Sequence, residues 1–179
     1  NAIALDRPAF YCNIERRLTA SLVNTIPNLD KSKLNILESN EDKILAANEW
    51  LTAIERIIKD RPNAVIIVDS IAMLCTSVEQ TEDIGSNKDM AGVPKLMTNF
   101  VRKMKDIIDV NNIILVLLSQ EQTNRDPTSR RKYDENGGMG VQYACSVWMN
   151  LSWFQTWERD ANTNSPMGQD SHFNIKASA

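Results

Sequence analysis

The chain has 179 residues, of which 42% are hydrophobic and 24% are charged, and this size and composition suit one globular domain with a sizeable core. Its net charge of −3 and pI of about 5.2 argue against a protein that coats DNA by bulk positive charge, but leave room for a local basic loop that binds DNA. No apolar run approaches the ~20 residues that cross a bilayer, and the N-terminal segment lacks the pattern of a secretory signal.

The first part of the chain predicts short strands separated by helices. Residues 10–14 and 34–37 are short apolar runs that suit buried strands, and residues 16–26 between them carry apolar side chains at helical spacing. Ser39 followed by Asp42 resembles a capping box, which predicts that a second helix starts there. The apolar face expected for this second helix consists of Ile44, Ala47, Leu51, Ile54 and Ile58.

The second part continues the alternation. Residues 64–68 form a β-branched run typical of a strand buried on both faces, and residues 113–118 form another fully apolar strand. Between them we expect a long amphipathic helix. Its buried stripe is predicted to contain Val93, Leu96, Met97, Phe100, Val101, Met104, Ile107 and Ile108. Residues 147–153 and 173–175 look like closing strands.

Strands that alternate with helices predict an α/β fold with a mainly parallel sheet flanked by helices, here as one domain over residues 1–179. Chemistry in such sheets gathers at the carboxyl ends of the strands. The residues that follow the apolar runs are therefore the candidates for function.

Polar residues follow directly after three of these predicted strands: Glu15, then Asp69 with Ser70, then Gln120 after Ser119. A carboxylate at such a position can hold the water shell of Mg²⁺. A second carboxylate can polarise a water for attack on a phosphoryl group, and a glutamine can orient that water or sense the γ-phosphate. Taken singly, each residue also fits an exposed polar residue that ends a strand.

The order of these motifs resembles the RecA family of recombinases. The segment AVIIVDS at 64–70 looks like the family's Walker B strand, and FYCNIE at 10–15 looks like its earlier strand, which ends in the water-activating glutamate. The segment LVLLSQ at 115–120 is similar to the strand whose final glutamine links nucleotide state to DNA binding.

The resemblance implies a RecA-like P-loop ATPase core that uses ATP and Mg²⁺. In that interpretation Glu15 and Gln120 are catalytic, and Asp69 and Ser70 bind the nucleotide, with Asp69 holding Mg²⁺ through water. The family's activity is DNA-dependent ATP hydrolysis in homologous recombination and repair. The implied partners are single-stranded DNA, duplex DNA for strand exchange, and further copies of the chain in a helical filament.

Two loops are candidates for DNA contact. The first resembles the family's first DNA-binding loop around Gly85 and Met90. The second, residues 121–136, combines cations with an aromatic residue, a composition that favours binding to single strands, although a solvated surface loop has the same composition. Its candidate residues are Arg125, Arg130, Arg131, Lys132 and Tyr133, followed by Gly137 and Gly138, which look like the Gly-Gly pair that closes the family's second loop.

The chain departs from the family pattern because it contains no GxxxxGK[ST] motif, whose backbone amides and lysine hold the phosphates. We interpret this as a core truncated at both ends, with the phosphate loop upstream of Asn1. Two alternatives stay open: a catalytically inactive RecA-like DNA-binding or assembly module, and a replicative helicase of the same superfamily. The cysteines, Cys12, Cys75 and Cys145, are odd in number and lack metal-ligand spacing, which fits the cytoplasm.

Overall fold

The computed structural model describes residues 2–40, 42–83, 92–123, 133–135, 138–159 and 166–178. The chain divides into two units, Asn1–Ala144 and Cys145–Ala179. Several predicted DNA-contact residues lie outside the described residues, namely Gly85, Met90, Arg125, Arg130, Arg131, Lys132 and Gly137. The single domain expected over 1–179 stays a prediction.

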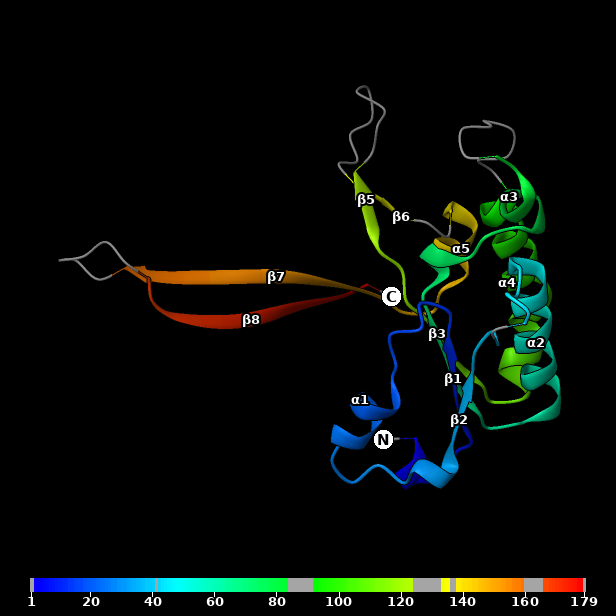
Figure 1. Cartoon of the computed structure of the whole chain (residues 1–179), viewed down its shortest axis with the longest axis horizontal. Helices are drawn as coiled ribbons and strands as arrows, with labels where there is room; N and C mark the ends of the chain where they lie inside the picture. Colours follow the sequence, from blue (N-terminus) through cyan, green and yellow to red (C-terminus); the bar gives the residue numbers. More distant parts are fainter. Residues whose placement is uncertain are drawn as a thin grey trace. The chain divides into compact units, whose positions relative to one another are not determined.

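The first unit contains a parallel sheet with the strand order β2-β1-β3-β4 (Figure 1). Its strands are β1 (Ala9–Asn13), β2 (Leu34–Leu37), β3 (Val65–Asp69) and β4 (Ile114–Leu117). All three strand pairs are parallel, and their carboxyl ends therefore lie along one edge. The predicted α/β class and parallel sheet are confirmed.

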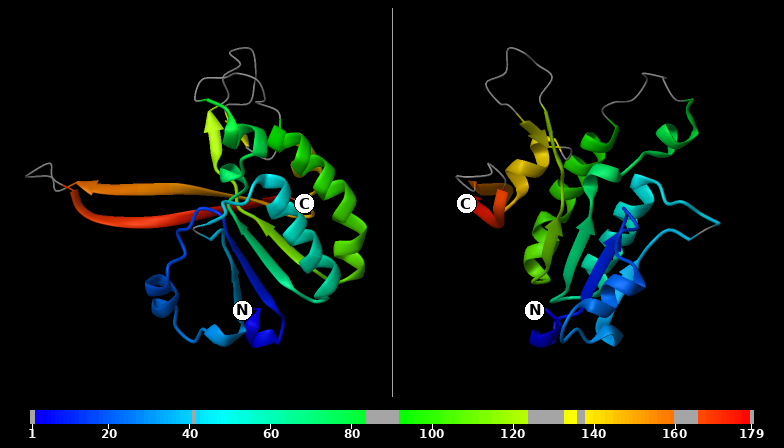
Figure 2. Two further views of the ribbon diagram at one scale, coloured as in Figure 1. Left: turned by 45° about the vertical axis from the view of Figure 1, so that its right-hand side comes forward. Right: turned by 60° about the vertical axis from the view of Figure 1, so that its left-hand side comes forward.

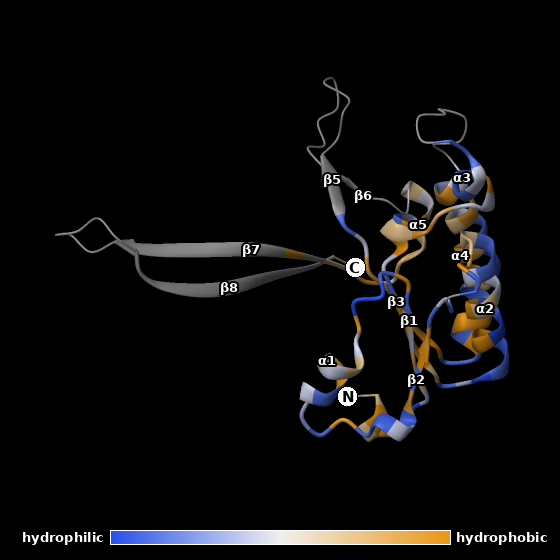
Figure 3. Cartoon of the chain, viewed as in Figure 1, coloured by the Kyte–Doolittle hydropathy of each residue, from blue (hydrophilic) through white to orange (hydrophobic). Residues whose placement is uncertain are grey.

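Two amphipathic helices, α2 (Ala47–Asp60) and α4 (Gly92–Val110), pack on one face of this sheet (Figure 2). The core joins Ile66 and Val68 of β3, both fully buried, to Ile58 of α2 and Met97 of α4. Figure 3 shows both helices carrying hydrophobic and hydrophilic residues side by side, as helices between a core and solvent do. The predicted stripe of α4 is confirmed, since all of its residues are in the core or packed against it.

The other face of the sheet is less covered within the described residues. Parallel register places Tyr11, Ile67 and Val116 side by side on this face. Ile36 and Ile114, which share it, keep 40% and 46% of their surface exposed. The helix on this side, α1 (Ala20–Thr25), is short (Figure 2).

The predicted start of the second helix is wrong. Ser39 does not cap it; its hydroxyl accepts a hydrogen bond from the Leu45 amide at 3.0 Å. The helix begins at Ala47, where the Glu49 side chain reaches back and accepts from the Ala46 amide at 3.0 Å. Ile44 therefore precedes the helix and is 71% exposed, so it does not belong to the apolar face.

The first helix is shorter than the segment 16–26 that carries the helical spacing. Arg16 adopts a left-handed backbone conformation with φ of 55°, and the chain turns there. Helix α1 (Ala20–Thr25) starts only after Thr19, whose hydroxyl accepts from the Leu22 amide at 3.2 Å. Residues 14–19 are thus a connection that begins at the end of β1.

Shorter elements complete the first unit. They are the 3-10 turns Ile3–Leu5, Lys31–Lys33 and Ile71–Met73, helices α3 (Ser77–Thr81) and α5 (Met139–Ala144), and the antiparallel strands β5 (Glu121–Thr123) and β6 (Tyr133–Glu135). Helix α5 packs against α4 so closely that a Cβ added at Gly140 would lie 2.4 Å from the Thr98 hydroxyl. No helix in the described part of the chain is long and apolar enough to cross a membrane.

The second unit is an antiparallel hairpin of β7 (Trp148–Arg159) and β8 (Pro166–Ser178). Both strands are longer than the predicted segments 147–153 and 173–175. The two predicted segments pair with each other, with Trp153 opposite Phe173. The predicted segments therefore cover only part of each strand.

Candidate active site

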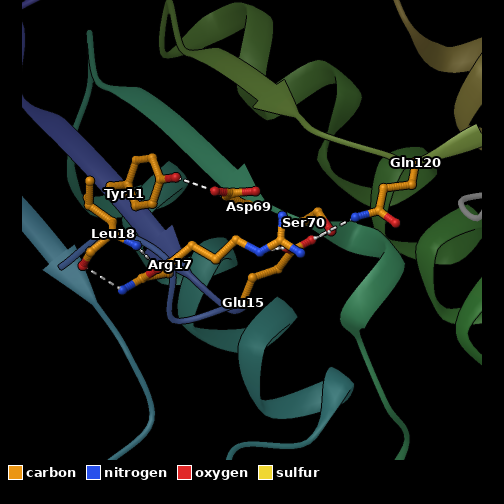
Figure 4. Close-up of polar contacts among 8 residues, drawn as sticks. Tyr11, Glu15, Arg17, Leu18, Asp69, Ser70 and Gln120 are labelled. Carbon is orange, nitrogen blue, oxygen red and sulfur yellow. Dashed lines mark hydrogen bonds and ion pairs between the residues drawn. The ribbon is translucent and has the colours of Figure 1, made fainter. Parts of the chain in front are cut away.

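The structure brings Glu15, Asp69, Ser70 and Gln120 together at the carboxyl edge of the sheet (Figure 4). Backbone bonds hold the strand ends in place. The Ile14 and Glu15 amides both donate to the Asp69 carbonyl, at 2.9 and 3.1 Å. The Leu118 amide donates to the Val68 carbonyl at 3.0 Å, which fixes the segment that leads to Gln120.

The Glu15 carboxylate is the centre of this cluster. Its side chain is only 5% exposed. Oε1 accepts hydrogen bonds from the Ser70 hydroxyl and, at 3.5 Å, from the Gln120 amide. Oε2 forms an ion pair with Arg17 Nε at 2.8 Å. A buried carboxylate is stable only when it is paired or hydrogen-bonded, and these contacts meet that need.

Asp69 has a partner that sequence reasoning missed. The Tyr11 hydroxyl donates a hydrogen bond to Asp69 Oδ2. Burial, then the hydrogen bond to Asp69 and the charges of Asp69 and Glu15, raise the pKa of Tyr11 far above its usual value. The phenol therefore stays protonated and remains a donor. The peptide bond between Asp69 and Ser70 is cis.

Asn13, also missed from the sequence, holds the connection that carries Glu15. It is 1% exposed, donates to the Leu18 carbonyl at 3.1 Å and accepts from the Leu18 amide at 3.1 Å. Its amide also reaches Glu38 Oε2 at 3.2 Å. The only sequence signal was its place two residues before Glu15, near the end of a strand.

The donor set fits a hydrated Mg²⁺ ion. Within the described residues, no group of three or more His, Cys, Asp or Glu side chains is placed to hold a metal. Mg²⁺ in nucleotide sites is typically bound by one or two protein oxygens, with water and phosphate as the other ligands. Asp69 supplies a carboxylate of that kind, and the Tyr11 hydroxyl donates a hydrogen bond to it.

The described part of the second DNA-binding candidate starts at the active site. Strand β5 begins at Glu121, directly after Gln120, and pairs with β6, which contains Tyr133. Gly138 follows with φ of 73°, a left-handed conformation that favours glycine. A Cβ at this position would also lie 3.2 Å from Pro94 Cβ.

Comparison with known proteins adds no family to these observations. No protein-family model matches the chain, and no curated protein matches it significantly. The likeness to RecA proteins thus stands on the chain's own motifs.

Proposed function

We propose that the protein is a DNA-dependent ATPase of homologous recombination and repair, which forms an ATP-bound filament on single-stranded DNA in the cytoplasm and promotes strand exchange with duplex DNA. One observation carries the proposal. Glu15, Ser70 and Gln120, from three different strand ends, share one hydrogen-bonded cluster beside Asp69. The separate motifs of the sequence therefore belong to one site.

Each residue has a role in ATP hydrolysis under this proposal. Glu15 takes a proton from the attacking water, and the Ser70 hydroxyl orients its carboxylate. Asp69 binds the water shell of Mg²⁺, and the ion, when bound, neutralises charge that develops on the phosphates. Tyr11 fixes the rotamer of Asp69 by its hydrogen bond.

Gln120 supplies the route from nucleotide to DNA. Its amide contacts the Glu15 carboxylate, and its backbone leads without a break into β5 of the hairpin. Loss of the γ-phosphate changes the hydrogen bonding around Gln120, and the residue next in the chain transmits this shift to the hairpin. The basic residues of 121–136 then change their hold on the DNA backbone.

The proposal requires phosphate contacts from outside these 179 residues, because the sequence has no GxxxxGK[ST] motif. We therefore expect negligible ATP turnover from the isolated chain, and the tests use the whole protein in which the chain occurs.

Glu15→Gln tests the catalytic assignment, because the amide keeps the size of the side chain but cannot accept a proton. We expect the rate of ATP hydrolysis to fall by roughly 10²–10⁴-fold while ATP-dependent DNA binding persists. The matched control is Glu55→Gln, since Glu55 lies on α2 and pairs with Lys59 and Lys103. Hydrolysis at the normal rate in Glu15→Gln would show that Glu15 is not the base.

The same assays separate the alternatives. DNA binding without any hydrolysis by the wild-type protein would identify an inactive RecA-like module. A closed ring that unwinds duplex DNA directionally would identify a helicase.

A further inference from the structure

Arg17 extends from the connection after β1 to the Glu15 carboxylate (Figure 4). Its Nε lies 2.8 Å from Glu15 Oε2, and its side chain is 73% exposed whereas that of Glu15 is 5% exposed. The exposed end of the guanidinium group thus lies at the surface directly beside the proposed base.

The neighbouring Arg16 is held differently. Its Nη2 atom donates to the Ser39 carbonyl at 2.8 Å and to the Asn40 carbonyl at 3.4 Å. The left-handed conformation of Arg16 turns the chain between the two arginines. Arg16 fastens the connection to the next loop, and Arg17 is the arginine that contacts the active site.

The Arg17 guanidinium keeps unused donors. Within the described residues, Nε contacts Glu15 Oε2, neither Nη group makes a polar contact, and the side chain as a whole is 73% exposed. A guanidinium is a planar fork whose N–H groups match the oxygens of a phosphate. Arg17 can therefore hold Glu15 through Nε and bind an anion through its Nη groups at the same time.

The charge of the site favours such an anion contact. Glu15 and Asp69 are both carboxylates, and a polyphosphate that approaches them meets like charge. The Arg17 guanidinium already lies beside Glu15, and its positive charge offsets this repulsion. Lysine would bridge the carboxylate and a phosphate less well, because its ammonium group is a compact point charge and lacks the planar fork of N–H donors.

We propose that Arg17 is a phosphate-binding residue, which bridges the Glu15 carboxylate and the terminal phosphate of a bound nucleoside triphosphate. This inference rests on the proposed function, because it takes the ligand to be ATP. It adds a protein cation from the chain's own connection after β1 to the phosphate contacts of the site.

The test compares the affinities of the whole protein for ATP and for ADP, both with Mg²⁺. Arg17→Gln removes the cation, Arg17→Lys keeps the charge without the fork, and Arg16→Gln is the matched control. We expect Arg17→Gln to weaken ATP binding about tenfold and to leave ADP binding unchanged, since ADP lacks the terminal phosphate. Arg17→Lys should lie between it and wild type, and Arg16→Gln should match wild type for both nucleotides.

An equal loss of affinity for ATP and ADP would reveal a merely structural ion pair and overturn the inference, as would wild-type affinities in Arg17→Gln. Both outcomes leave the ATPase proposal intact. A wild-type protein that neither binds nor hydrolyses ATP overturns the proposed function instead. If Arg17→Gln does not fold, Arg17→Lys decides by the same ratio of ATP to ADP affinity.

Discussion

The Tyr11 hydroxyl is the one described side-chain donor to Asp69, so its removal tests how the metal ligand is oriented. Tyr11→Phe keeps the ring and loses the hydrogen bond. Because hydrogen bonds to charged groups contribute roughly 1.5–3 kcal/mol and this one is only part-buried, we expect the Mg²⁺ concentration for half-maximal ATP hydrolysis to rise several-fold. The measurement is a Mg²⁺ titration of the ATPase rate.

Tyr143→Phe is the control for this substitution, since Tyr143 lies on α5 and is 77% exposed. It should leave the Mg²⁺ titration unchanged. An unchanged titration in Tyr11→Phe as well would mean that Tyr11 does not position Asp69.

At the residue scale, the sequence predicts which residues belong to the site better than it predicts which side chains contact each other. Glu15 and Asp69 could be named because each directly follows an apolar run, and Gln120 because it stands one residue after another such run. Tyr11 could not, because its contact with Asp69 depends on β1 and β3 being neighbours in the sheet, which no periodicity reveals. The contacts of Arg17 and Asn13 could not be predicted either. Both depend on the path of residues 14–19 after β1, which is set by tertiary contacts.

Among the elements, α2 and α4 stabilise the sheet that carries the site. Ile54 of α2 is 1% exposed within the core. Ile54→Ala should lower the free energy of unfolding by about 2–5 kcal/mol, because it removes buried methyl groups and leaves a cavity. Urea denaturation of the chain measures this loss.

Val110→Ala provides the comparison, since Val110 ends α4 and is 83% exposed. Its effect should stay within about 0.5 kcal/mol. Equal losses for the two variants would show that Ile54 does not pack in the core.

Sequence patterns predicted some helices and strands well and the start of one helix wrongly. The stripe of α4 was predictable because helical periodicity over a long segment is a strong signal, and the β-branched run at 64–68 was predictable for a similar reason. The start of α2 was not, because Ala46 has no capping side chain and Ser39 offered a better local signal. Glu49 decides the start by bonding back to the Ala46 amide.

At the scale of the whole molecule, the sheet of the first unit has one apolar face that α2 and α4 do not cover. Parallel sheets are normally buried on both faces. We therefore expect the isolated 179-residue chain to bind a hydrophobic dye such as ANS through this face. Replacing Ile36 and Ile114 together by Thr should reduce the fluorescence of the bound dye, because both residues share the face and are exposed.

Ile44→Thr is the control, because Ile44 is 71% exposed but precedes α2 rather than lying on the sheet. Equal dye binding by the double variant and wild type would show that this face is not the exposed apolar surface.

The most direct test of the proposed function is the effect of single-stranded DNA on ATP hydrolysis by the whole protein, with and without Gln120→Ala. We expect DNA to stimulate hydrolysis by the wild-type protein. We expect Gln120→Ala to lose this stimulation, because the contact between Glu15 and the residue preceding β5 is gone. Wild-type hydrolysis that ignores DNA, or equal stimulation of the variant, would contradict the coupling of this site to DNA.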